Sequence, residues 1–228
     1  MSKKEVIEKI RGNLIVSCQA RPGWPMYGAE IMAAFAMAAK QGGAAAVRAT
    51  GPDNLKAIKQ KVDLPLMGIN KIFSDESEVY ITPTWESARQ ILEVGIDIVC
   101  MDATPRSRPG GENVRDILNM IRNNYPDVIA VGEISTIDEA KAILDCGFDF
   151  ISTTLAGFTK ESSGIHSVDL QLIRDIRGCM DIPVIAEGMI STPAEARMAL
   201  EAGAFSVVVG TAITRPEILT KRFVEGMK

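Results

Sequence analysis

The sequence predicts a (β/α)8 barrel of the TIM type, formed by one domain that spans residues 1–228. Three observations favour this fold. Eight short apolar runs alternate with helical patterns, each run ends at a polar or charged residue, and helix-ending glycines recur at the length of two βα units. Continuous apolar runs of strand length are typical of a parallel sheet that is buried on both faces. The chain length also suits one barrel of about 250 residues.

The expected elements can be placed in order along the chain. The charged segment Ser2–Arg11 is expected to form a short helix that caps the bottom of the barrel, and Ile218–Phe223 is expected to belong to the last barrel helix. The eight expected strands are Leu14–Cys18, Ala44–Val47, Leu66–Ile69, Ile98–Met101, Val128–Val131, Phe150–Ile151, Val184–Ala186 and Val207–Val209.

A repeat in the sequence supports the alternation of helices and strands. GGAAAVRAT, VGIDIVCMDAT, CGFDFISTTL and AGAFSVVVGTA share the order of helix end, glycine, short turn and buried strand. Their glycines are expected directly after a helix, where the backbone is left-handed and a Cβ atom is unfavourable. These glycines are Gly43, Gly95, Gly147 and Gly203.

Helix starts are also visible in the sequence. Thr136 and Thr192 each stand three residues before a glutamate, which is the pattern of a capping box. Thr84 is expected to be the N-cap of the helix that begins at Trp85. These residues are interpreted as structural, and they fix where the loops that carry functional residues end.

Composition and charge exclude several classes of function. A net charge of −4 gives neither the basic surface of a nucleic-acid-binding protein nor a polybasic membrane patch. No apolar stretch approaches the roughly 18 residues of a membrane-spanning helix, and the charged N-terminal segment does not resemble a signal peptide. We therefore expect a cytoplasmic protein with no nucleic-acid or membrane partner.

Cysteine and histidine usage argues against a metal centre and against disulfides. The four cysteines are scattered without a CxxC pair, and Cys18 and Cys100 lie in expected strands, where a buried inert thiol is typical. The single histidine, His166, lies in a polar loop and cannot supply a multi-histidine site. We expect no bound metal, although carboxylates alone can hold a magnesium ion.

The polar residues that end the strands are the candidate site. In a barrel of this type they converge on one cleft, and such positions are typical of catalysis or ligand binding. Charges buried there without partners are costly, so a network of ion pairs, Arg48 with Asp102 and Lys71 with Glu133, is the structural alternative. The converging residues are Gln19, Arg48, Lys71, Asp102, Glu133 and Glu187, with Thr153 and Thr154 after the sixth run.

Residue chemistry suggests a role for some of these side chains. A neutral lysine can abstract a carbon-bound proton or form a Schiff base, and Glu187 is the natural acid–base partner of Lys71. Arg48 suits the binding of an oxygen-rich substrate because it remains charged. Barrels of this type often bind phosphate with the loops after the seventh and eighth strands. The backbone N–H groups there that are expected to bind phosphate belong to Gly188, Gly210, Thr211 and Ala212.

Motifs over nearly the whole chain resemble the N-acylglucosamine-6-phosphate (N-acetylmannosamine-6-phosphate) 2-epimerases of sialic acid catabolism. LIVSCQA, VDLPLMGINK, MDAT, GFDFISTTLAGFT, VIAEG and AITRP stand in the order and spacing of that family. The resemblance implies the same barrel, a homodimer, no cofactor, and a sugar phosphate as substrate. It implies Lys71 and Glu187 as catalytic residues. Substrate binding is implied for Gln19, Arg48, Glu133 and Arg215.

The chain departs from the family pattern at several positions. The family usually has aspartate where Glu133 stands, arginine or asparagine where Met189 stands, and an aliphatic residue in place of Asn70. Phe158 stands where tyrosine is frequent, and the loop RPGWPMYGAE after the first strand is unusual. These departures leave the catalytic pair intact and bear on which N-acyl sugar is accepted.

Two alternative functions are compatible with the same residues. One is a lysine Schiff-base aldolase or synthase that acts on a phosphorylated substrate through a covalent bond to Lys71. The other is a non-catalytic barrel that binds a sugar phosphate. A metal-dependent pentulose-phosphate epimerase is disfavoured, because its histidine ligands have no counterparts in the sequence.

Overall fold

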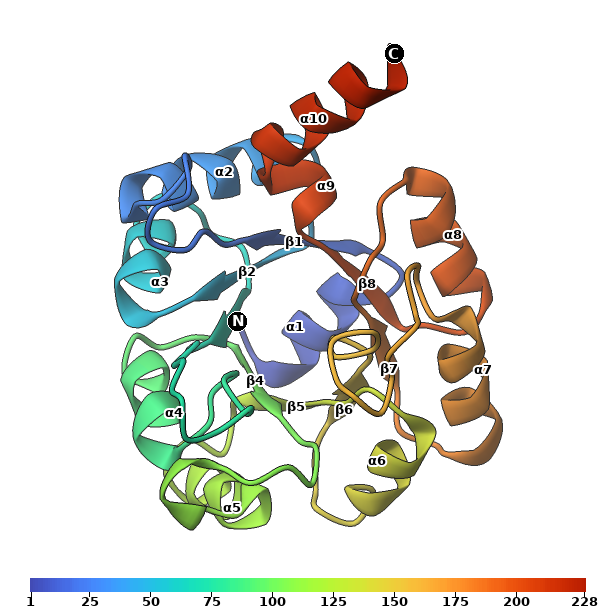
Figure 1. Cartoon of the computed structure of the whole chain (residues 1–228). Coiled ribbons are helices and arrows are strands. Elements are labelled where there is room, and N and C mark those ends of the chain that lie inside the picture. The colour runs from blue at the N-terminus through green and yellow to red at the C-terminus, as the bar shows by residue number, and fades with distance from the viewer.

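Eight parallel strands close into a barrel, paired in chain order from β1 to β8 and from β8 back to β1. The computed structural model describes residues 1–228, and Figure 1 views it along the barrel axis. The predicted fold class is confirmed. The strands are β1 (Leu14–Cys18), β2 (Ala46–Thr50), β3 (Leu66–Ile69), β4 (Ile98–Asp102), β5 (Ile129–Glu133), β6 (Phe150–Ser152), β7 (Val184–Ala186) and β8 (Ser206–Val209).

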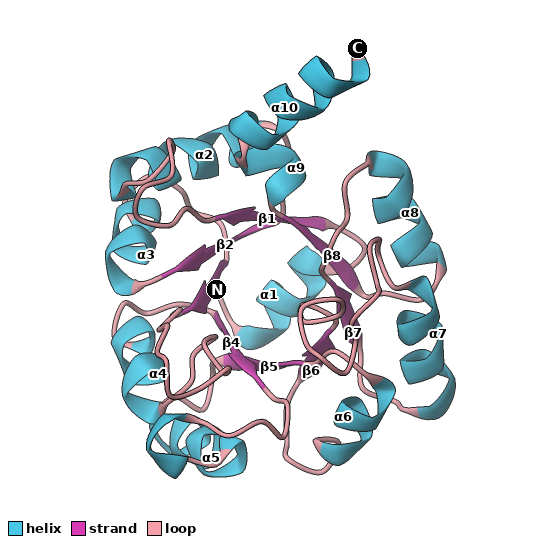
Figure 2. Ribbon diagram, in the orientation of Figure 1, coloured by secondary structure: helices cyan, strands magenta, loops and turns pink.

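Helices surround the sheet, and Figure 2 shows the ring that they form around the strands. None of them is long and apolar enough to cross a membrane. The helices are α1 (Lys3–Ile10), α2 (Ala29–Gln41), α3 (Pro52–Lys59), α4 (Trp85–Leu92), α5 (Val114–Asn124), α6 (Ile137–Ala142), α7 (Leu170–Cys179), α8 (Pro193–Glu201), α9 (Thr211–Thr214) and α10 (Pro216–Gly226), with a 3-10 turn at Pro109–Gly111.

The local signals at the helix ends are confirmed. Thr136 and Thr192 each form a capping box with the glutamate three residues later, and Thr84 caps α4. The four repeated glycines all have positive φ angles, between 76° and 106°. Glycine is required there because side chains with a Cβ atom rarely adopt this backbone conformation.

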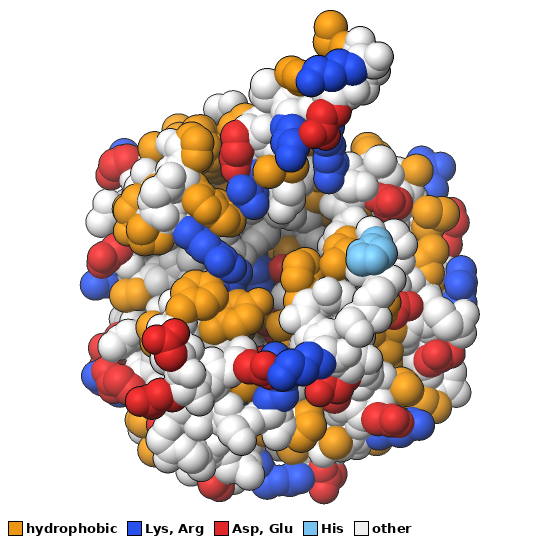
Figure 3. Space-filling view, in the orientation of Figure 1, with side chains coloured by type: hydrophobic (Ala, Val, Ile, Leu, Met, Phe, Trp, Pro, Cys, Tyr) orange, Lys and Arg blue, Asp and Glu red, His pale blue; other side chains and the backbone are white.

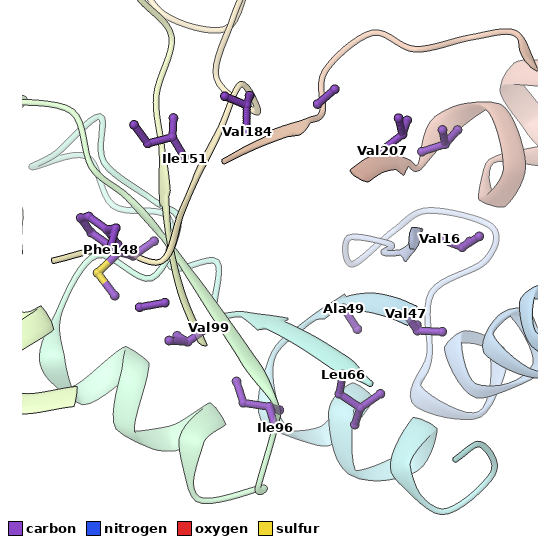
Figure 4. Close-up of a cluster of buried hydrophobic side chains, with 14 of the residues drawn as sticks. Val16, Val47, Ala49, Leu66, Ile96, Val99, Phe148, Ile151, Val184 and Val207 are labelled. Carbon is purple, nitrogen blue, oxygen red and sulfur yellow. The ribbon is translucent and has the colours of Figure 1, made fainter. Parts of the chain in front are cut away.

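Alternation along the strands divides the core into two layers. Residues on the outer face pack against the helices, and Figure 4 labels ten of the residues that it draws from this layer, from Val16 to Val207. Residues of the opposite phase, such as Ala46, Met67 and Ile129, fill the barrel interior. Because side chains alternate with a period of two, the interior phase continues into the polar residues at the C-terminal ends of the strands. This phase directs those residues toward one cleft.

The predicted cap at the bottom of the barrel is confirmed. Val6 and Ile10 of α1 are buried, and they pack with the apolar residues of the barrel interior. Figure 1 shows α1 across the barrel opening at the far end. The interior is therefore closed at its N-terminal end, and the site is open only at the opposite end.

The predicted boundaries of five strands, β2, β4, β5, β6 and β8, are wrong by one to three residues. The second strand was expected at Ala44–Val47, but β2 begins at Ala46 and extends through Arg48 to Thr50. The cause is that Arg48 points into the barrel, where ion pairs take the place of apolar packing. In the same way, β4 and β5 each extend to a charged residue, which is the last residue of the strand.

The last helix also differs from the prediction. Ile218–Phe223 lies in α10, but no residue of α10 is buried. The short helix α9 follows β8, and α10 leaves the ring of helices between α2 and α8 with its C-terminal end pointing away from the barrel (Figure 1). Consequently α10 does not cover the barrel of its own chain.

Candidate active site

A cavity of about 500 Å³ opens at the C-terminal ends of the strands. Figure 3 shows it as the hollow at the centre of the molecule, with lysine and arginine side chains around its rim. Of the residues predicted for the site, Asp102, Glu133 and Thr153 do not line this cavity, whereas Thr154 and the others do. The lining residues among the predicted ones are Gln19, Arg48, Lys71, Glu187, Gly188, Gly210, Thr211, Ala212 and Arg215.

Arg48 is the electrostatic centre of the site. Its side chain is 1% exposed, and its Nη2 atom lies 2.5 Å from Glu133 Oε1 while its Nη1 atom lies 3.0 Å from Glu187 Oε1. Burial opposes the charge, but Glu187 and Glu133 outweigh it and raise the pKa of Arg48. The guanidinium is therefore a permanent cation that ties β2 to β5 and β7.

The two ion pairs that the sequence suggested, Arg48 with Asp102 and Lys71 with Glu133, do not form. Arg48 does not pair with Asp102, which instead accepts from Arg106 at 2.6 Å and from the Thr104 hydroxyl at 2.7 Å. Lys71 makes no ion pair with Glu133, since Arg48 occupies that carboxylate. Asp102 thus supports the loop after β4, and the amine of Lys71 is left without a carboxylate partner.

Glu133 lies behind Arg48 rather than at the cavity wall. Its side chain is completely buried, and one carboxylate oxygen, Oε2, has no hydrogen-bond partner. A substrate in the cavity would meet Arg48 before it met Glu133. The carboxylate is therefore placed to orient Arg48, and any effect on substrate passes through that guanidinium.

Lys71 is the second residue after β3, and it lines the cavity. Its backbone N–H donates to Thr50 Oγ1 at 3.1 Å, which fixes the start of the loop. Burial, and then the charge of Arg48, lower the pKa of Lys71 to about 8 against the opposing influence of Glu133 and Glu187. A substantial fraction of the amine is therefore neutral near physiological pH and can accept a proton.

Glu187 directly follows β7 and lines the same cavity as Lys71. Thr154 donates from its hydroxyl to Glu187 Oε2 at 3.1 Å, and the Thr153 hydroxyl bonds the backbone N–H and C=O of Glu187. Burial raises the pKa of this carboxyl, and the attraction of Arg48 only partly offsets it. Glu187 can therefore both hold and release a proton in the neutral range.

Several polar atoms in the site have no partner within the chain. Gln19 donates from Nε2 to Ser17 Oγ at 2.7 Å, but its Oε1 atom is buried without a hydrogen bond. Arg48 Nε is likewise buried and unpaired. Buried polar groups are seldom left unsatisfied. The acceptor on Gln19 and the donor on Arg48 are therefore available to a polar ligand.

The loops after β7 and β8 present unpaired backbone donors to the same cavity. The N–H groups of Gly188, Thr211 and Ala212 donate to no acceptor of the chain, and α9 begins directly after Gly210. Gly188 has a φ of 106°, which requires glycine. Convergent N–H groups of this kind bind anions. Arg215, at the end of α9, adds a positive charge.

Met189 occupies an unusual backbone conformation beside the cavity. Its φ of 57° is in the left-handed region that glycine and asparagine adopt most easily. A methionine there costs roughly 1–2 kcal/mol. This is one of the positions at which the sequence departs from the family pattern, and it lines the cavity.

Sequence reasoning missed part of the cavity wall. Most of the missed residues lie in loops, but Arg222 lies in α10, and the unusual composition of the loop after β1 pointed only to Arg21 and Trp24. The missed lining residues include Arg21, Trp24, Tyr80, His166, Ser191 and Arg222.

All four cysteines are free thiols, with Cys18 and Cys100 buried as expected. No group of three or more His, Cys, Asp and Glu side chains is arranged to hold a metal ion.

Comparison with known proteins gives consistent results over the whole chain. Residues 32–228 match the family described as "Putative N-acetylmannosamine-6-phosphate epimerase". A relative from Clostridium perfringens (strain SM101 / Type A), named "Putative N-acetylmannosamine-6-phosphate 2-epimerase", is 45% identical over 223 residues, covering 98% of this chain and 100% of its own. One of the same name from Listeria monocytogenes serotype 4b (strain F2365) is 43% identical over 225 residues, covering 98% and 97%.

Solved structures agree with the sequence comparison. The N-acetylmannosamine-6-phosphate 2-epimerase from Clostridium perfringens superposes with a TM-score of 0.93 at 45% identity, covering 96% of this chain and 95% of that one. A thiamine phosphate pyrophosphorylase from Pyrococcus furiosus has a TM-score of 0.62 at 18% identity, covering 92% and 89% of the two chains, and shares the fold alone.

Proposed function

The chain belongs to the N-acetylmannosamine-6-phosphate epimerase family, and from this premise we propose that it is a cofactor-independent epimerase acting at C2 of an N-acyl-hexosamine 6-phosphate. The substrate is N-acetylmannosamine 6-phosphate and the product is N-acetylglucosamine 6-phosphate. The observation that carries the proposal is the unpaired Lys71 amine, whose pKa of about 8 allows it to act as a base inside a cavity rich in polar groups.

The chemistry follows from the placement of these groups. In the open-chain sugar, C2 lies next to the C1 aldehyde, so its proton is acidic. Lys71 removes this proton, the electron pair moves to the C1 oxygen as an enolate, and a proton is returned to the opposite face of C2. The buried guanidinium of Arg48 and the amide of Gln19 are placed to bind the oxygens of the sugar.

The remaining site residues have complementary roles in this proposal. Gly188, Gly210, Thr211 and Ala212 bind the phosphate through backbone N–H groups, with Arg215 as counter-charge. Glu187 exchanges a proton with the substrate, either at the ring oxygen during opening or at C2 as a second acid.

Reactivity is expected to depend on pH through Lys71. Only the neutral amine accepts a proton, so kcat/KM should rise as pH passes through the lysine pKa of about 8. The measurement is kcat/KM between pH 6 and about 11.5, since its limbs report the ionisations of the free enzyme. An acidic limb near the ordinary lysine value of about 10.4 would contradict the assignment.

Proton NMR of N-acetylmannosamine 6-phosphate in D₂O tests the proposed reaction directly. With enzyme, the C2 proton signal should decline as deuterium is incorporated, and the signals of the gluco epimer should appear. Without enzyme the spectrum should not change. Ligand binding with neither exchange nor conversion would instead support a non-catalytic sugar-phosphate-binding barrel.

The Schiff-base alternative is not favoured by the family to which the chain belongs, and it has its own test. A neutral lysine is also what an imine-forming aldolase or synthase requires. Borohydride would reduce an imine and leave a stable substrate adduct on Lys71. We expect no such adduct by mass spectrometry while C2 epimerisation proceeds. A trapped adduct at Lys71 would overturn the epimerase mechanism.

We also propose that the protein is a homodimer in which α10 is covered by the second copy. The support is that α10 has no buried residue and exposes Phe223 (74%) and Val224 (51%), and that Met227 (84%), directly after the helix, is exposed as well. Apolar side chains gathered on one unpartnered helix are typical of an interaction surface. A cytoplasmic location stays a prediction of the sequence.

Sedimentation equilibrium tests the homodimer. The wild-type chain should have twice the mass of 24.6 kDa, and Phe223→Glu with Met227→Glu should yield the monomer. The variant Met120→Glu, which changes an exposed methionine on α5, is the matched control and should remain dimeric. A monomeric wild-type protein at micromolar concentration would contradict the proposal.

A further inference from the structure

Arg21 is held between two aromatic rings at the mouth of the cavity. Its guanidinium carbon lies 4.5 Å from the centre of the Phe73 ring and 5.6 Å from that of Trp24. Arg21 and Trp24 belong to the loop between β1 and α2, while Phe73 belongs to the loop between β3 and α4. The guanidinium therefore connects two loops that are some fifty residues apart in the sequence.

The row of stacked groups continues in both directions. On one side, the guanidinium of Arg215 lies 3.6 Å from the centre of the Trp24 ring. On the other side, Phe73 stacks on Tyr80 at 5.0 Å with an interplanar angle of 20°, and Lys71 Nζ lies 5.8 Å from the Tyr80 ring centre. A continuous series of cations and rings thus links the loop after β8 to the proposed base.

Arg21 has no other attachment in the chain. It forms no ion pair and its side chain makes no hydrogen bond, whereas Arg215 is paired with Glu217 at 2.7 Å. Cation–π contacts at exposed sites contribute about 0.5–1 kcal/mol each. The two rings are therefore what keeps this guanidinium at the cavity, which it lines.

We infer that Arg21 is a positioning residue of the site: it joins the loop after β1 to the loop after β3 across the cavity mouth and directs its positive charge toward Lys71. This inference rests on the proposed function, because its effect is exerted on the proposed base. Arg21 and Trp24 both occur in the unusual loop RPGWPMYGAE after β1.

Charged groups face Lys71 from several elements. Arg48 approaches from β2, Glu133 from β5 and Glu187 from β7. Arg21 approaches from the loop after β1 and contributes to the lowered pKa of Lys71, in addition to the larger contributions of burial and Arg48. The ring of Tyr80 lies against the amine, and His166, Arg215 and Arg222 line the same cavity farther along its wall.

The test compares Arg21→Gln and Arg21→Lys with a matched control. Glutamine removes the charge and lysine keeps it. Arg11→Gln is the control, because Arg11 also lies 4.5 Å from a ring centre, that of Phe205, but contacts the α1 end of the barrel. The readouts are thermal unfolding, kcat and KM, and the acidic limb of kcat/KM for C2 epimerisation.

Arg21→Gln should move the acidic limb about half a pH unit higher and lower kcat/KM at pH 7 about threefold, since a higher lysine pKa leaves less neutral amine. Arg21→Lys should restore the position of the limb, and Arg11→Gln should match the wild type in both. Thermal unfolding should shift by only a few degrees in the Arg21 variants, because the two contacts affected contribute about 0.5–1 kcal/mol each. If Arg21 only held the two loops together, its replacement would not change the pH position of the acidic limb.

Two results would overturn the inference, and they differ from failure of the proposed function. If Arg21→Gln keeps the wild-type limb and a wild-type kcat/KM, Arg21 does not position the base. If Arg21→Lys shifts the limb as far as Arg21→Gln does, the charge is not responsible. If the wild-type chain does not epimerise C2 at all, the proposed function itself fails before Arg21 is considered.

Discussion

Replacing Lys71 with alanine is expected to lower the rate of C2 epimerisation at least 10²–10⁴-fold, the usual contribution of a general base. The amine has no ion-pair partner, so its removal leaves no unpaired charge and the fold should persist. The N–H groups proposed to bind phosphate lie on the loops after β7 and β8, away from the substitution. Turnover should therefore be lost while binding of the sugar phosphate is retained.

Rates measured by NMR and binding measured by calorimetry test this prediction together. Lys71→Arg should be equally inactive, because arginine keeps the positive charge but does not deprotonate. Lys56→Ala, at an exposed position of α3, is the matched control and should keep the wild-type rate. A near-normal rate in Lys71→Ala would refute the assignment of the base.

Replacing Arg48 with methionine is expected to have the largest effect on stability. The variant would leave Glu133 buried without its counter-ion, and breaking a buried ion pair from one side costs roughly 3–5 kcal/mol. Activity should fall as well, because Glu187 loses its 3.0 Å contact and the substrate loses a fixed cation. Chemical denaturation and the NMR assay measure the two effects separately.

A double variant distinguishes these two effects of Arg48. Arg48→Met combined with Glu133→Gln removes both charges of the closest pair, so much of the free energy of unfolding should return. Epimerase activity should not return, because the cation that faces the cavity is still missing. Recovery of activity in the double variant would show that Arg48 serves only to neutralise Glu133.

The positions of the strands could be predicted because apolar runs of strand length mark a buried parallel sheet. Leu14–Cys18, Leu66–Ile69 and Val184–Ala186 are predicted and observed with the same boundaries. The boundaries of β2 could not be predicted in this way. The apolar run begins in the turn before the strand, and the strand continues past the end of the run through Arg48. The position of α10 could not be predicted either. Its sequence pattern is that of a barrel helix, and the same pattern fits a helix that does not pack on the barrel of its own chain.

The sequence allowed us to predict which residues converge on the candidate site, but not which ion pairs they form there. A barrel brings all strand ends together, so every polar residue there becomes a candidate. Whether Arg48 meets Asp102 or Glu133 depends on side-chain length and direction across the cavity, and neither is visible in the sequence. Rim residues such as Arg21 and His166 were missed because they stand in loops without a periodic pattern.

The helix α1 has a consequence for the fate of the abstracted proton. Since Val6 and Ile10 seal one end of the barrel, exchange between the Lys71 amine and bulk water has to pass the same opening that the substrate occupies. Once the sugar is seated, the hydrogen taken from C2 stays on the amine for the lifetime of the enolate. When Lys71 also returns the hydrogen to C2, part of the isotopic label of the substrate is carried through to the product. When Glu187 returns it as a second acid, the product carries a hydrogen from solvent instead.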